Sequence, residues 1–214
     1  SSRAIRLYLL ILLVVSVFFI NKLLPFLWIV SGIAAVLFFF YFSTKLTKRW
    51  HQYSDMYFVK RLFWMSLVIR LVWVVFSYFF YLLMVGEPFD FAAADAKGYH
   101  IEATWVADMI SQGKIANYFE YMEGRYSDMG YPLYLGVLYW LTDDSIIIAR
   151  LLKALFSALT VLFTYKVAKR NFGEDIGRMA SIFLMLFPNV IFYTGLHLKE
   201  VEMIFLSMFF IERP

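Results

Sequence analysis

The stretch "RLFWMSLVIRLVWVVFSYFFYLLMVGEPFDFAAADAKGYH", residues 61–100, decides the fold of this chain. Its first part, 61–85, is an apolar run long enough to cross a bilayer, which takes about 20 helical residues. Its second part, 86–100, places acids, a tyrosine and a histidine directly after that run. The sequence therefore combines a membrane-spanning segment with a polar element at its end.

The composition extends this interpretation to the whole chain. Of 214 residues, 62% are hydrophobic and 21% aromatic, whereas soluble domains are roughly 45–50% apolar. Backbone inside a bilayer must form its hydrogen bonds internally, so we expect an all-α polytopic membrane protein. The absence of cysteine excludes disulfides and thiolate metal sites. A net charge of +4 does not indicate nucleic acid, because the basic residues gather between apolar runs.

The apolar runs predict about five transmembrane helices and the start of a sixth. The spans are expected at about 5–20, 24–43, 61–85, 145–167 and 176–195, with the sixth beginning at 201. We divide the chain into residues 1–59, a transmembrane hairpin with a basic loop, and residues 60–214, a second transmembrane module. The chain begins without Met and ends within an apolar run, so we expect it to be the N-terminal part of a longer protein.

Charge asymmetry predicts the orientation. The connection between the second and third spans holds five basic residues, namely Lys45, Lys48, Arg49, Lys60 and Arg61, against the single acid Asp55. The positive-inside rule places this connection in the cytoplasm. The loop 86–144 then lies outside, where ten acids face only three basic residues.

Two helices are expected in the outer loop. The first runs from Asp95 to Gln112 and ends at Gly113 in the C′ position. Its helical period places Trp105, Val106, Met109 and Ile110 on one apolar arc. Asp95, Tyr99 and Glu102 fall within the same arc, at its N-terminal end. An acid on a buried face is costly unless it is paired or used, although Asp95 could also simply cap the helix. The second helix, 131–142, is rich in Tyr and Trp and is expected to lie at the membrane interface.

A second polar cluster, "GLHLKE" at 195–200, follows the fifth span on the same side. Lys199 offers a cation for a phosphate, with the alternative that it snorkels toward lipid headgroups. Glu200 offers a carboxylate that could hold a metal or orient a substrate. His100 and His197 lie on the same side and could meet as metal ligands, although their spacing matches no known motif.

Three cations within the spans need partners. Arg70 lies near mid-depth, and Arg150 and Lys153 lie toward the outer end of their span. A buried Arg costs several kcal/mol, on the order of +2.5–3.5 by insertion scales. We expect a structural ion pair for Arg70, and for Arg150 either contact with an anionic headgroup or snorkelling.

These elements, in this order, resemble the GT-C superfamily of polyprenyl-phosphate-sugar-dependent glycosyltransferases, and most closely the branch of lipid A aminoarabinose transferases and protein O-mannosyltransferases. The resemblance covers about residues 60–212 and rests on Asp95 and Tyr99, on "GYPLYLGVLYWL", on Arg150 and on "FPNVIFYTGLHLKE". Ala96 follows Asp95 where the family often has a second acid, and "HLKE" replaces its common Leu-Asp-Pro. The first departure argues against a two-acid metal site in this motif.

The resemblance implies a bacterial inner-membrane enzyme with a periplasmic active face and a lipid-linked sugar donor. Asp95 would be the general base and would take a proton from a glycan, lipid or protein acceptor. Lys199 and Arg150 would neutralise the leaving phosphate, and Glu200 would position the acceptor or a divalent cation such as Mg²⁺ or Mn²⁺. Tyr99 would orient Asp95 or pack under the sugar. The remaining substrate-binding candidates are His197 and Glu102, and inversion at the sugar is implied.

Two other functions fit the same sequence. A transporter or flippase for lipid-linked anions would use Arg70, Arg150 and Lys153 as a path through the membrane. Alternating-access sites are usually marked by paired Gly- or Pro-broken spans, and the sequence lacks such a pair. A non-catalytic membrane subunit of an envelope assembly complex is the other alternative.

Overall fold

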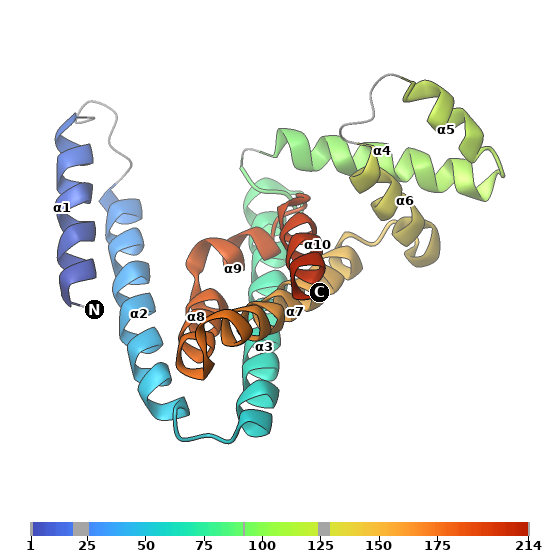
Figure 1. Ribbon diagram of the computed structural model, residues 1–214. Coiled ribbons are helices and arrows are strands. Elements are labelled where there is room, and N and C mark those ends of the chain that lie inside the picture. Colours follow the sequence, from blue (N-terminus) through green and yellow to red (C-terminus); the bar gives the residue numbers. More distant parts are fainter. Residues whose placement is uncertain (1, 19–25, 92, 124–128, 214) are drawn as a thin grey trace.

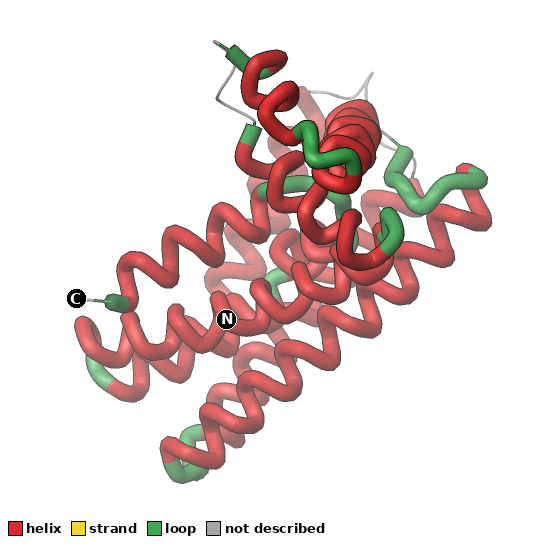
Figure 2. The backbone as a smooth tube through the Cα atoms, turned by 90° about the vertical axis from the view of Figure 1, so that its right-hand side faces the viewer, coloured by secondary structure: helices red, strands yellow, loops and turns green. Residues whose placement is uncertain are grey.

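The computed structural model describes residues 2–18, 26–91, 93–123 and 129–213. In Figures 1 and 2 this part of the chain consists of helices joined by short loops. The helices are α1 (Ser2–Phe18), α2 (Phe26–Trp50), α3 (Asp55–Val85), α4 (Ala94–Ser111), α5 (Ile115–Tyr121), α6 (Gly130–Thr142), α7 (Ile146–Phe172), α8 (Glu174–Leu186), α9 (Pro188–Thr194) and α10 (Glu200–Glu212). The prediction of an all-α protein is confirmed.

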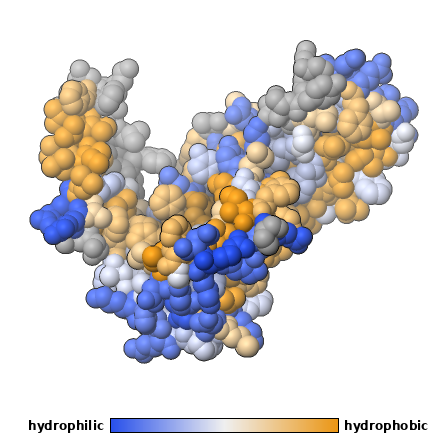
Figure 3. Space-filling view, viewed as in Figure 1, coloured by the Kyte–Doolittle hydropathy of each residue, from blue (hydrophilic) through white to orange (hydrophobic). Residues whose placement is uncertain are grey.

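Two helices, α3 and α7, are long and apolar enough to cross a membrane. The pair α8 and α9 counts as a third span if its two helices, bent by 51°, are taken together. The described structure therefore supports a membrane protein with two or three candidate spans. Apolar side chains also cover the visible face of α1 except at its N-terminal end, where hydrophilic residues gather (Figure 3).

The bend follows from Pro188, which opens α9 and has no N–H to donate to the last turn of α8. Arg70 of α3 supplies hydrogen-bond donors at this break. Its guanidinium donates to the carbonyl oxygens of Leu184 and Met185, at 3.4 and 3.3 Å, and to the hydroxyl of Ser157 at 2.6 Å. The predicted ion pair for Arg70 is replaced by these hydrogen bonds, because the broken helix leaves carbonyls that need a donor.

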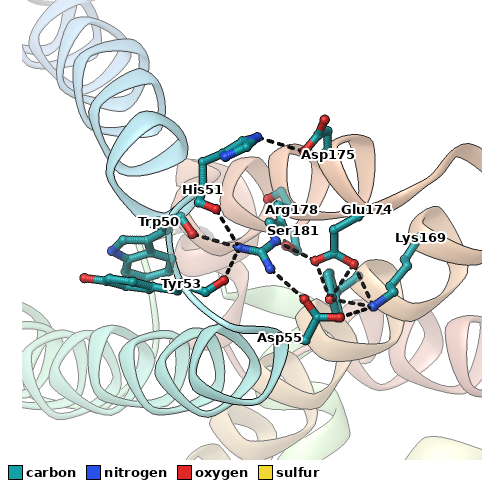
Figure 4. A network of polar contacts seen from close by, with 10 residues as sticks. Trp50, His51, Tyr53, Asp55, Lys169, Glu174, Asp175, Arg178 and Ser181 are labelled. Atoms are coloured by element: carbon teal, nitrogen blue, oxygen red, sulfur yellow. Dashed lines mark hydrogen bonds and ion pairs between the residues drawn. The ribbon is translucent and has the colours of Figure 1, made fainter.

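Arg178 of α8 ties two connections together at one end of the bundle (Figure 4). Its Nη1 donates to the carbonyl oxygens of Trp50 and Tyr53, at 2.9 and 2.8 Å, and its Nη2 donates to Asp55 at 2.8 Å. Glu174 accepts from its Nε. The connection between α2 and α3 is thereby fixed to the start of α8.

The main core lies beside this network. Its buried members are Trp50, Phe58, Leu62, Val161, Tyr165, Ile182 and Met185. They come from α2, α3, α7 and α8. Figure 3 shows hydrophilic residues gathered below them, around the connection between α2 and α3. The basic segment predicted as a loop is thus largely helical, since α2 continues to Trp50 and α3 begins at Asp55.

The other end of the bundle carries α4, α5 and α6, which extend away from α3 in Figure 1. The predicted helix 95–112 is observed as α4, and Gly113 follows it with φ +69° as expected for a C′ residue. The predicted helix 131–142 is observed as α6, and its position at the membrane interface stays a prediction. The two pack closely at Gly136, where a Cβ would lie 2.3 Å from Cγ1 of Val106.

We expect Gly136→Ala to force α6 away from α4, because the added Cβ would also lie 2.6 Å from Cβ of Val106. Overpacking of this kind costs about 1–3 kcal/mol, which in a chain of this size lowers Tm by about 3–10 °C. Thermal unfolding in detergent measures the change. Gly98→Ala in α4 is the matched control, because nothing lies within 4 Å of the added carbon, and its Tm should stay equal or rise. Equal Tm values for both variants would contradict the close packing.

Candidate functional site

The segments singled out by the sequence meet at the α4–α6 end of the bundle. Leu198, in the connection between α9 and α10, packs against the cluster of Phe89, Ala93 and Ala96 at the start of α4. Lys199 Nζ lies 5.7 Å from the ring centre of Tyr99. The two polar clusters, "ADAKGYH" and "GLHLKE", are therefore neighbours in space, as their predicted placement on the same side requires.

Lys153 of α7 holds this assembly together. Its side chain is 1% exposed. Nζ donates to the carbonyl oxygen of Leu196 at 2.9 Å, to that of Leu198, and to the Tyr131 hydroxyl at 3.2 Å. Nζ also lies 3.6 Å from Oε2 of Glu202 in α10. One ammonium thus connects α6, α7, α10 and the non-helical turn that precedes α10.

A groove of about 390 Å³ opens beside this ammonium. Its apolar wall comes from Phe156, Met203, Phe205 and Leu206, and its polar part from Tyr131, Tyr134, Lys199 and Glu202, with Gly130 at the rim. The rings of Phe156 and Phe205 stack at 4.7 Å and hold α10 against α7. An amphiphile with a polar head matches such a surface.

A chain of hydrogen bonds runs from α4 inward. His100 Nδ1 lies 2.9 Å from the Tyr139 hydroxyl, which lies 3.0 Å from His197 Nε2. Burial lowers the pKa of His100. Burial, with the charges of Lys153 and Arg150, holds the pKa of His197 well below its usual range. Both imidazoles therefore favour the neutral form.

Arg150 is buried, so it neither snorkels to the surface nor offers its guanidinium to an exposed headgroup, and its role at the leaving phosphate stays a prediction. It is 1% exposed and donates to the carbonyl oxygen of Pro88, with its guanidinium carbon 6.0 Å from the ring centre of Tyr78. The carbonyl of Pro88 lies just beyond the end of α3, outside any helix, and therefore offers a free acceptor.

Asp95 lies in the first turn of α4 and is exposed. The buried face of α4 is formed by Ala96, Ala103, Val106 and Ala107. The predicted apolar arc is observed in part, because Val106 is buried and Trp105, Met109 and Ile110 pack with it against the cluster that contains Tyr118 of α5. Ala103 and Ala107, which the arc did not include, form the face that lies against α6. Asp95 sits one helical turn before Tyr99 on the surface of α4.

Glu102 is half-buried and accepts a hydrogen bond from the Tyr118 hydroxyl at 2.7 Å. Burial, and then this carboxylate, raises the pKa of Tyr118. The contact joins α4 to α5. Glu102 thus has a structural partner in addition to its predicted role in substrate binding.

Glu200 opens α10 and is exposed. It lines a second groove, of about 330 Å³, together with Ser157, Thr160, Asn189, Val190, Tyr193, Val201 and Ile204. Lys199 and Glu200 therefore border different grooves, although they are adjacent in sequence.

The described residues hold no group of three or more His, Asp or Glu side chains that could bind a metal ion. His100 and His197 meet through Tyr139 rather than as a pair of ligands. The residues in this part of the chain do not fit a divalent cation, and the chemistry below is derived without one.

The sequence interpretation missed Glu202, Tyr131, Tyr134 and Tyr139, and it gave Lys153 no central role. Two signals were present. Glu202 is an acid inside the apolar run that begins at 201, and Lys153 follows Arg150 by three residues on the same helix. Both are costly placements in a span and indicate a shared polar interior.

Comparison with protein-family models, with curated proteins and with solved structures finds no match to this chain.

We expect Lys153→Met to destabilise the protein strongly, because it leaves the Glu202 carboxylate and two carbonyls without their cation. Breaking one side of a buried pair costs about 3–5 kcal/mol. Lys166→Met is the control, since its ion pair with Glu212 is at the surface and contributes at most about 1 kcal/mol. In thermal unfolding, Lys153→Met combined with Glu202→Gln should recover part of the loss. A Tm for Lys153→Met no lower than that of Lys166→Met would exclude the central role of this ammonium.

The pKa of His197 predicts that the protein loses stability in acid. The unfolded state takes up a proton near pH 6.5, whereas the folded state resists until a much lower pH. Stability is therefore complete above about pH 6.5 and falls below it, by about 1.4 kcal/mol per pH unit for one histidine. Tm measured from pH 7.5 to 5.5 should decline, and His197→Gln should flatten the decline. His51→Gln, exposed at the opposite end, should leave it unchanged, and equal slopes for both variants would refute the assignment.

Proposed function

We propose that the protein is a membrane glycosyltransferase that takes a sugar from a polyprenyl-phosphate carrier and transfers it to an acceptor hydroxyl. In this proposal α1, α2 and α10 also enter the membrane, giving five spans and the start of a sixth. The α4–α6 end then faces the periplasm of a bacterial inner membrane.

The observation that carries the proposal is the amphiphilic groove between α6, α7 and α10. Its apolar wall, formed around Phe156 and Phe205, suits the first isoprene units of a lipid carrier. Lys199 at the polar end provides a positive charge for the phosphate. A groove with both characters at the boundary of the spans supports a lipid-linked anionic substrate.

The proposed reaction uses Asp95 and Lys199. Asp95 accepts the proton of the acceptor hydroxyl as that oxygen attacks the anomeric carbon. The bond from that carbon to the phosphate oxygen breaks, and polyprenyl phosphate leaves with the bonding electrons. Lys199 stabilises the charge that develops on the phosphate. Tyr99 links the two groups in space, because it lies one turn after Asp95 and its ring is under the Lys199 ammonium.

A transporter for lipid-linked anions is the second candidate, and the break between α8 and α9 is the observation that favours it. Against this, Arg70 bridges the break with several hydrogen bonds, as a fixed support would. A transporter would also need no base at Asp95, which gives a direct way to separate the two functions.

We expect Asp95→Asn to lower kcat about 100-fold or more, because a general base contributes 10²–10⁴ to such rates. The KM for the donor should change little. The measurement is consumption of undecaprenyl-phosphate-linked sugar in membranes that express the protein. Asp108→Asn, exposed on the same helix, is the control and should retain full activity. Unchanged consumption by correctly inserted Asp95→Asn would remove Asp95 from the mechanism.

A further inference from the structure

Glu202 is the least satisfied group in the groove. Its side chain is 11% exposed, and neither carboxylate oxygen has a hydrogen-bond donor among the described residues. A buried carboxylate without donors is costly, because it loses its bonds to water and gains none in exchange. The groove that it lines offers the place from which donors can come.

Lys153 supplies charge to Glu202 but does not meet its hydrogen-bonding needs. An ammonium has three N–H donors. In this structure Nζ contacts three other acceptors, namely the carbonyl oxygens of Leu196 and Leu198 and the hydroxyl of Tyr131. Glu202 Oε2 lies further away, at 3.6 Å. The Glu202 carboxyl group therefore lies beside a cation while both of its oxygens lack a donor among the described residues.

Tyr134 adds a second open group in the same groove. Its hydroxyl is buried and has no partner among the described residues. Its ring stacks on that of Tyr131 at 6.1 Å, which fixes its position in α6. A hydroxyl can both donate and accept, so Glu202 and Tyr134 together match a ligand rich in hydroxyl groups.

The charges in the groove favour a phosphate at one position and hydroxyl groups at another. A phosphate is repelled by Glu202 and attracted by Lys199, which lines the same groove. Hydroxyl groups, in contrast, donate well to a carboxylate, and such bonds are stronger than neutral ones. An apolar chain would then lie along Phe205 and Leu206.

From this arrangement we propose that Glu202, assisted by Tyr134, binds the hydroxyl groups of the sugar on the lipid-linked donor. This inference rests on the proposed function. It makes Glu202 a residue of sugar recognition, whereas Lys199 and the apolar wall bind the carrier itself. The two parts of the groove can therefore be tested separately.

The test compares binding of bare undecaprenyl phosphate with binding of undecaprenyl-phosphate-glucose and undecaprenyl-phosphate-mannose to the purified protein in detergent. The wild type should bind at least one sugar-linked carrier more tightly than the bare carrier. Glu202→Gln should weaken that sugar-linked carrier about 10- to 100-fold, as expected for hydrogen bonds to a charged group. It should leave the bare carrier unchanged or slightly tighter. Glu212→Gln, at the far end of the same helix where Glu212 pairs with Lys166, is the control and should change neither.

Any other result of these binding measurements contradicts a specific part of the proposal. If the wild type binds bare and sugar-linked carriers equally, or if Glu202→Gln weakens both equally, Glu202 does not recognise the sugar, while the groove retains its function. If the wild type binds neither carrier, the proposed function itself is wrong. Tyr134→Phe removes a single oxygen and covers the case in which Glu202→Gln fails to fold. It should lose part of the preference for the sugar-linked carrier, and an undiminished preference in this variant would then reject the proposal.

Discussion

Backbone carbonyls left over where helices end are the constraint on which this structure depends. In a bilayer each such group must find a donor inside the protein. The chain solves this with buried cations. Lys153 serves the turn before α10, Arg70 serves the break between α8 and α9, and Arg178 serves the connection between α2 and α3. Arg150 donates to the carbonyl oxygen of Pro88, just beyond α3, while its Nε and Nη1 have no partner among the described residues.

The same device explains why these cations are tolerated. A cation buried alone in a span is expensive, but one that donates to several carbonyls removes the cost of both partners. Carbonyls carry no net charge, so a local positive field remains at Arg70, whereas Asp55 and Glu174 neutralise the charge of Arg178. At Lys153 the positive charge meets a carboxylate, Glu202, which is why that break differs from the one at Arg70. The candidate site therefore lies where the fold already needs a buried cation for its free carbonyl groups.

The sequence predicted the positions of helices better than the contacts that their side chains make. Long apolar runs predicted α3 and α7, and Gly113 predicted the end of α4, because length and a required positive φ are local properties. The buried face of α4 was predicted only in part, since Trp105 and Val106 pack against α5 as the apolar pattern indicates, but the contact of Ala103 and Ala107 with α6 was missed. Close helix packing instead selects small residues, as Ala103 and Gly136 show. Which carbonyl a cation will meet depends on where distant helices break, and no local pattern contains that information.

The position of Lys153 also determines what the groove can hold. By fixing the carbonyls of Leu196 and Leu198, it sets the direction in which α10 starts. Lys199 and Glu202 then border the same groove, while Glu200 between them borders the other. Lys199 and Glu202 thus give one groove side chains of opposite charge. A ligand whose own charge and hydroxyl groups are separated by a few atoms would match both side chains, and under the proposed function a sugar joined to a phosphate is such a ligand.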